Sequence, residues 1–122
     1  MELALWIVTG LLALVFLVSG LTKTFQSRAR LRDSGMTYVE DFPAVGIKAI
    51  GLLEILGGLG LVLPPIFDSR TEIVPAAAVG LALLMAGAVV VHVRRREPFV
   101  VPLVLAVLAL LLAVLRLDAY AL

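Results

Sequence analysis

Four long apolar runs, separated by short polar segments, dominate the pattern of this sequence. They cover residues 3–21, 44–63, 74–93 and 99–115. Each run falls within the length of about 17 to 25 residues that a membrane-spanning helix requires. The second run ends at Pro64-Pro65, which favours the end of a helix because proline lacks the N–H group and clashes with the preceding turn. The pattern therefore predicts four transmembrane helices.

Composition supports a membrane protein. Hydrophobic residues make up 62% of the chain, against roughly 45 to 50% in soluble domains, and the mean hydropathy is +1.15. The connections between the runs are short, so successive helices should be antiparallel neighbours. We therefore expect an all-α fold, in which residues 1–122 form a single antiparallel bundle of four transmembrane helices.

The basic residues are unevenly divided between the two ends of this bundle. Seven belong to the first and third connections, which are Lys23, Arg28, Arg30, Arg32, Arg94, Arg95 and Arg96. Two belong to the opposite side, Arg70 and Arg116. Because cytoplasmic loops carry the excess of Lys and Arg, the first and third connections are predicted to be cytoplasmic. Both termini should then lie on the outer side of the cell membrane. The first connection should be interfacial, with a short helix that ends near Ser34-Gly35.

Glu54 lies near the middle of the second run, where a carboxylate costs about 2.5 to 3.5 kcal/mol on insertion scales. It should therefore face other helices or a wet cavity. We expect no cation at its depth, so the carboxylate should be unpaired and should take up a proton. Glu54 is then a candidate proton carrier or ligand contact, and the alternative is a structural acid that is hydrogen-bonded across the bundle.

Small residues mark the faces where helices should pack closely. On a helical wheel Gly51, Glu54 and Gly58 lie within roughly 60° of one another, so a neighbouring backbone can approach the acid. The third run is also rich in alanine and glycine at spacings of four. The predicted packing positions are Gly51, Gly57, Gly58, Ala76, Gly80 and Gly87.

Three further side chains are candidates for a ligand site. Lys23 follows the first span and Lys48 lies about one and a half turns inside the second, so the two could form a basic mouth below Glu54 for an anionic or carbonyl ligand. The alternatives are an ordinary basic anchor for Lys23 and a snorkelling side chain for Lys48. His92 lies at the end of the third span, where an interfacial role is the alternative to a functional one.

Other chemistries are excluded or unsupported. The chain has no cysteine, which excludes disulfides, thiol relays and thiolate metal sites within it. We predict no metal site, and the arginine run reads as a membrane anchor, so nothing indicates nucleic-acid binding.

A resemblance to a known family rests on a set of spaced residues. Gly20-x-x-Lys23 closes the first span, and Lys48-x-x-Gly51-x-x-Glu54-x-x-Gly57-Gly58 continues to Leu61-x-Leu63-Pro64 on the second. With the small-residue third span ending near His92, this pattern resembles the DoxX-like family over nearly the whole chain. The resemblance implies a small four-helix integral membrane protein, with Lys23, Lys48, Gly51 and Glu54 as the positions carried over. Its wider group includes the small subunit of thiosulfate:quinone oxidoreductase, and its relatives are associated with oxidative-stress defence and with catechol or quinone detoxification.

These features leave three functions open. The preferred one is a quinone-linked accessory subunit or membrane anchor of an oxidoreductase, more an accessory than an enzyme by itself and without an intrinsic cofactor. The second is a small proton-coupled transporter or a lipid-binding or small-molecule-binding protein. The third is a structural partner of another membrane protein or of a second copy of the chain. All three place the protein in the lipid bilayer.

Overall fold

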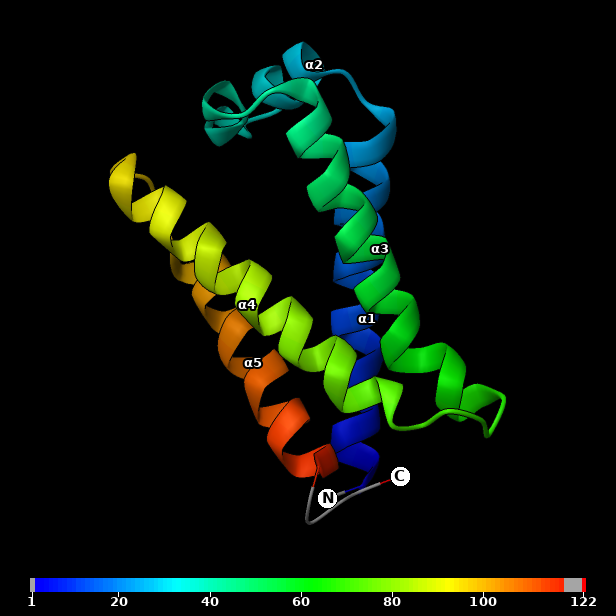
Figure 1. Ribbon diagram of the computed structural model, residues 1–122. Helices are drawn as coiled ribbons and strands as arrows, with labels where there is room; N and C mark the ends of the chain where they lie inside the picture. The colour runs from blue at the N-terminus through cyan, green and yellow to red at the C-terminus, as the bar shows by residue number, and fades with distance from the viewer. Residues whose placement is uncertain (1, 118–121) are drawn as a thin grey trace.

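The computed structural model describes residues 2–117 and 122, and the regular structure within them is entirely helical (Figure 1). The elements are α1 (Glu2–Phe25), α2 (Arg28–Asp33), the short 3-10 helix η1 (Thr37–Asp41), α3 (Ala44–Ile66), α4 (Ile73–Arg94) and α5 (Val100–Leu117). The helices α1, α3, α4 and α5 are each long and apolar enough to span a membrane. The predicted all-α fold with four spans is therefore confirmed.

Two of the helix ends extend past the predicted ones by three residues or more, and the other bounds agree within two. Helix α1 continues through Gly20 to Phe25 and does not end at residue 21, and this extension brings Lys23 into the helix. Helix α3 continues to Ile66, with Pro64 and Pro65 inside its last turn. In that position the two prolines remove the hydrogen bonds to the carbonyls four residues earlier and crowd the preceding turn, and the helix ends directly after them.

The four long helices form two pairs. Helix α1 packs along α3, and α4 packs along α5, while α3 and α4 make the main contact between the pairs. Figure 1 shows the pairs close together near the termini and spread apart at the other end. We call that end the basic end, because it carries residues 26–43 and 95–99. The opposite end carries the N-terminus and the α3–α4 loop.

Glycines allow α1 and α3 to approach at backbone contact. A Cβ atom added to Gly20 would lie 2.5 Å from the Gly51 carbonyl oxygen, and one added to Gly51 would lie 2.8 Å from the Gly20 carbonyl oxygen. Further along the same interface, a Cβ on Gly58 would lie 3.2 Å from the carbonyl oxygen of Ala13. Gly57 faces α4 instead, where an added Cβ would lie 2.5 Å from Leu81.

The other small residues predicted for packing lie on the exposed side of α4. Ala76 and Gly80 are on the exposed side of α4, and a Cβ on Gly80 would meet nothing within 4 Å. Gly87 is exposed too and has the same open surroundings. The buried face of α4 is offset from these residues, and an added Cβ at Gly80 or Gly87 meets no other helix. Close helix packing is thus absent within the chain at Gly80 and Gly87, and it stays a prediction at Ala76.

The connection between α1 and α3 is a folded segment at the basic end. Ser27 caps α2 by accepting a hydrogen bond from the Arg30 N–H. Gly35 follows the helix at a φ of +109°, as a Schellman C-cap requires, and this agrees with the helix end predicted from the sequence. Arg28 donates hydrogen bonds to the carbonyls of Val39 and Glu40, so this arginine fixes η1 to α2.

A second, smaller apolar cluster attaches this segment to the bundle. Leu31 of α2, Val39 of η1 and Ile47 of α3 are buried together, with Tyr38 and Phe42 packed against them. The main core lies separately, between the four long helices. The segment therefore packs on the first turn of α3.

An ion pair joins α1 and α5 at the opposite end. The Arg116 side chain is buried and lies 2.5 Å from the Glu2 carboxylate, and its guanidinium lies 5.0 Å from the centre of the Trp6 ring. In the sequence, Arg116 counted only as one of the two basic residues on the side opposite the other seven. The structure instead makes it part of the contact that brings the two helix pairs together near the termini.

We predict that Gly20→Ala and Gly51→Ala each destabilise the protein by about 1 to 3 kcal/mol, because a methyl group would collide with the facing backbone. Gly80→Ala is the matched control, since it makes the same change in a helix with open space. It should be neutral or stabilise by up to about 1 kcal/mol. Thermal unfolding in detergent measures all three. Equal melting temperatures for the three variants would contradict the packing scheme.

The basic end is expected to face the cytoplasm, because seven of the nine Lys and Arg residues compared lie there. The absence of natural cysteine allows single cysteines to report on this orientation. We predict that an impermeant maleimide labels Ser69→Cys in intact cells but labels Asp33→Cys only after lysis. The opposite labelling pattern would reverse the assigned topology.

Candidate functional site

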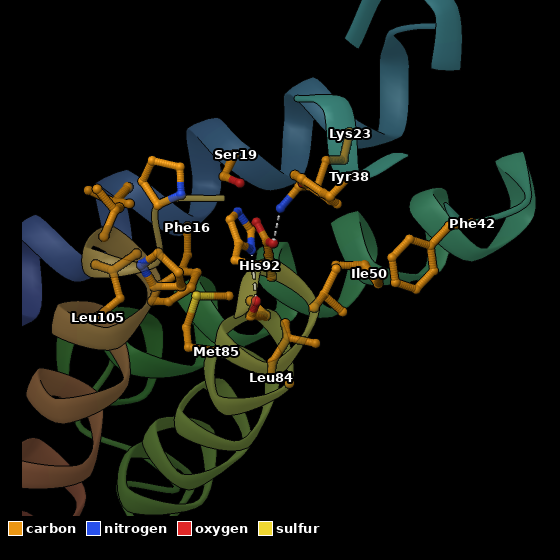
Figure 2. A pocket seen from close by; sticks show the side chains of 18 residues that line it. Phe16, Ser19, Lys23, Tyr38, Phe42, Ile50, Leu84, Met85, His92 and Leu105 are labelled. Atoms are coloured by element: carbon orange, nitrogen blue, oxygen red, sulfur yellow. Dashed lines mark hydrogen bonds and ion pairs between the residues drawn. The ribbon is translucent and has the colours of Figure 1, made fainter. Parts of the chain in front are cut away.

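A cavity of about 570 Å³ lies between the two helix pairs at the basic end (Figure 2). Residues from α1, α3, α4, α5 and η1 line it, together with Pro98 from the α4–α5 loop. Most of the lining is apolar. The polar side chains in the wall are Ser19, Lys23, Tyr38, Glu54 and His92.

Lys23 and Glu54 form a buried ion pair in the wall of this cavity. The Lys23 Nζ lies 2.5 Å from the Glu54 Oε1, and Glu54 is 0% exposed. Cα–Cβ bonds tilt toward the N-terminus of their own helix. Because α1 and α3 are antiparallel, the two side chains tilt toward each other across the contact at Gly20 and Gly51. Figure 2 shows the Lys23 side chain reaching across to the acid.

The prediction that Glu54 has no cation within reach is therefore wrong. It took the first span to end at residue 21, which leaves Lys23 outside the span. The extension of α1 to Phe25 places Lys23 on the face turned toward α3. The expectation of a protonated Glu54 depended on an unpaired carboxylate. The ion pair with Lys23 removes that reason.

One oxygen of the Glu54 carboxylate remains without a partner. Within the part of the chain that the structure describes, Oε1 accepts from Lys23 whereas Oε2 is buried and makes no hydrogen bond. An unsatisfied buried polar atom costs about 1 to 3 kcal/mol, and more if it is charged. Because Glu54 lines the cavity, Oε2 is the feature of this site that most directly indicates a missing ligand contact.

His92 is on the opposite wall, near the end of α4. Its Nδ1 lies 2.7 Å from the Ala88 carbonyl oxygen. A carbonyl can only accept, so Nδ1 carries the proton, and Nε2 is an acceptor in the neutral ring. The imidazole also lies against Tyr38, with 5.3 Å between ring centres. The structure thus brings His92, Lys23 and Glu54 to one cavity.

Lys48 is separated from these three residues. Its side chain is exposed, and its Nζ donates a hydrogen bond of 2.7 Å to the Thr24 carbonyl in the last turn of α1. A cation at this point is favourable because it neutralises a free carbonyl at the C-terminal end of a helix. The basic mouth expected from Lys23 and Lys48 together is not formed, since only Lys23 faces the cavity.

Sequence reasoning missed Tyr38 as a site residue. It treated this aromatic residue as part of an interfacial loop, whereas η1 folds over the cavity and places Tyr38 in its wall. The Tyr38 ring centre is 5.8 Å from the Lys23 Nζ, within reach of a cation–π interaction. A signal was present, because Met36, Tyr38, Val39 and Phe42 place several apolar side chains close together in an otherwise polar connection.

Polar contacts connect η1 to the α4–α5 loop and so close one side of the cavity. Arg95 lies 2.8 Å from the Asp41 carboxylate and 3.2 Å from that of Glu97. The Thr37 hydroxyl donates a hydrogen bond to Glu97. Thr37, and then the Arg95 guanidinium, lower the pKa of Glu97 below its usual 4.5. The acid therefore stays ionised at neutral pH and this connection persists.

The sequence matches the DoxX-like family over residues 7–114, which is most of the chain. The chain belongs to the DoxX-like family. No curated relative and no solved structure matches it. This DoxX-like protein is thus a small multi-pass membrane protein, as its four long apolar helices also indicate. Among the described residues, no group of three or more His, Cys, Asp or Glu side chains comes together as the ligands of a metal would.

We predict that Lys23→Met destabilises the protein by about 3 to 5 kcal/mol, because it leaves the Glu54 carboxylate buried without its cation. Lys48→Met is the matched control, since it removes an exposed lysine with one hydrogen bond and should cost about 1 kcal/mol. The double change Lys23→Met with Glu54→Met should recover most of the loss. Chemical unfolding in detergent gives the three values, and equal losses for the two single variants would argue against the buried pair.

Proposed function

We propose that this protein binds a quinone in the cavity at the basic end and serves as an accessory subunit of a membrane oxidoreductase. One observation carries the proposal. A largely apolar cavity of about 570 Å³ has a buried Lys23–Glu54 pair in its wall, and one oxygen of that carboxylate has no hydrogen-bond partner among the described residues.

Size and polarity fit a ring with an apolar body and oxygen substituents. Pockets for small molecules and cofactors usually measure about 300 to 1,000 Å³ and combine apolar walls with a few placed polar groups. Here Phe16, Met85 and Leu105 provide apolar and aromatic surface. Lys23 supplies a donor for a ring oxygen, because only one of its three N–H groups is used by Glu54.

An accessory role agrees with the side chains that the chain offers. The sequence contains no cysteine, so it cannot pass electrons through a thiol or disulfide of its own. Electrons for a bound quinone would then come from a partner protein. The family resemblance also favours an accessory role, since the wider group includes a subunit of an enzyme that reduces quinone.

We predict that a short-chain benzoquinone binds the purified protein and that Gly87→Leu weakens this binding about tenfold or more. Gly87 lines the cavity and has open space around it, so a leucine would occupy the volume that the ring needs. Gly80→Leu is the matched control, since it makes the same change two turns earlier on α4, away from this cavity.

Native mass spectrometry of the detergent-extracted protein measures the bound fraction and the stoichiometry together. It also reports any quinone or lipid that copurifies. Failure of the wild-type protein to bind any benzoquinone would overturn the proposal. Equal weakening by the two leucine substitutions would show that binding occurs outside the cavity.

A second candidate function is proton-coupled transport, and the ion pair in the cavity wall favours it. Buried ionisable residues inside membrane spans often mark proton or substrate pathways. The Lys23–Glu54 pair, with His92 in the same cavity, offers groups that can exchange protons. Proton-coupled uptake into liposomes, lost in Glu54→Gln, would favour transport. Copurification with a membrane enzyme in the absence of any ligand would favour a purely structural role.

A further inference from the structure

We propose that the cavity selects the hydroxyl form of its ring ligand over the carbonyl form, so that the reduced quinol binds about tenfold or more tightly than the quinone. This inference rests on the proposed function, since it concerns the same cavity. It depends on a count of hydrogen-bond donors and acceptors in the cavity wall.

The count begins with Glu54. Its Oε1 already accepts from Lys23, and its Oε2 is a buried acceptor without a partner among the described residues. An ionised carboxylate has no proton to donate. A ligand atom that is to satisfy Oε2 must therefore donate. Because the last torsion angle of glutamate is broad, a small rotation of the carboxylate can turn Oε2 toward the cavity.

A hydroxyl group and a carbonyl group meet this wall differently. A hydroxyl oxygen can accept from a free N–H of Lys23 while its proton is donated to Oε2 of Glu54. A carbonyl oxygen can accept from Lys23, but it leaves Oε2 unsatisfied. The two forms of the same ring therefore differ by one hydrogen bond to a charged acceptor, and such a bond changes affinity by roughly tenfold or more.

The other polar groups of the wall do not reverse this preference. His92 donates from Nδ1 to Ala88, so the Nε2 of the neutral ring is a second acceptor. The Tyr38 hydroxyl donates to the Met36 sulfur, so its oxygen can only accept from a ligand. The Ser19 hydroxyl can donate or accept and is therefore compatible with both forms. The wall thus presents two acceptors that need a donor, Glu54 Oε2 and His92 Nε2, and a carbonyl ligand can donate to neither of them.

Selection between the two forms has a consequence for the bound couple. If the reduced form binds more tightly, binding favours reduction of the ligand, and a tenfold preference raises the two-electron potential by about 30 mV. A quinone in this cavity would then be a better electron acceptor than in the bilayer.

The test compares three probes with the same ring: tetramethylbenzoquinone, its hydroquinone and the dimethyl ether of that hydroquinone. The ether keeps the ring oxygens but has no proton to donate. We expect the purified wild-type protein to bind the hydroquinone about tenfold or more tightly than either of the others. Equilibrium dialysis in detergent under anaerobic conditions measures the three dissociation constants.

Glu54→Gln is the decisive variant. Lys23 can only donate, so it holds the amide oxygen of the glutamine and turns the NH₂ group to the former position of Oε2. That group donates, so the preference for the hydroquinone should fall at least tenfold or reverse. The corresponding control is Ser19→Ala, which removes a hydroxyl from the wall without changing this count of fixed donors and acceptors.

The outcomes separate this inference from the proposed function. Equal binding of the hydroquinone and the quinone by the wild-type protein would overturn the selection and leave quinone binding intact. Tight binding of the ether would show that donation to the protein is not the cause, and would overturn it as well. If none of the three probes binds, both proposals fail. Because the comparison within the wild type is sufficient, a Glu54→Gln variant that fails to fold does not prevent a decision.

Discussion

The buried ion pair between Lys23 and Glu54 is the constraint on which the rest of the structure depends. Each charge alone would be costly at this depth, and the pair is tolerated because the two groups are in direct contact. That contact requires α1 and α3 to lie almost backbone to backbone at Gly20 and Gly51. Glycine at these positions is therefore a condition for burying the charges, and the packing of the first helix pair cannot be separated from its electrostatics.

The same arrangement explains why a cavity forms at the basic end. The two helix pairs are joined near the termini, where Arg116 of α5 meets Glu2 of α1, and they spread apart toward the other end (Figure 1). The ion pair faces the space that opens there. The η1 segment lines one side of this space through Tyr38 and is fixed to the α4–α5 loop by Arg95. A ligand in the cavity would be in contact with a charged wall.

The fold could be predicted from the sequence almost completely, whereas the candidate site could be predicted only in part. Four apolar runs of spanning length leave little choice of architecture. The identity of the buried acid was also readable, because Glu54 is the only acidic residue within the apolar runs. Its partner was not, since the end of α1 decided it, and element boundaries are the least reliable part of a prediction from sequence. Tyr38 was missed because its position depends on a tertiary contact of η1.

The correction at Lys23 changes the chemistry of the site. An unpaired, protonated Glu54 would have been a hydrogen-bond donor, suited to a carbonyl oxygen. A Glu54 that is held by Lys23 is an acceptor, and the ammonium group becomes the donor. Both descriptions include an acid in an apolar cavity, but they favour opposite oxidation states of a quinone ligand. The decisive information is thus the position of one cation, which follows from four more residues of helix at the end of α1.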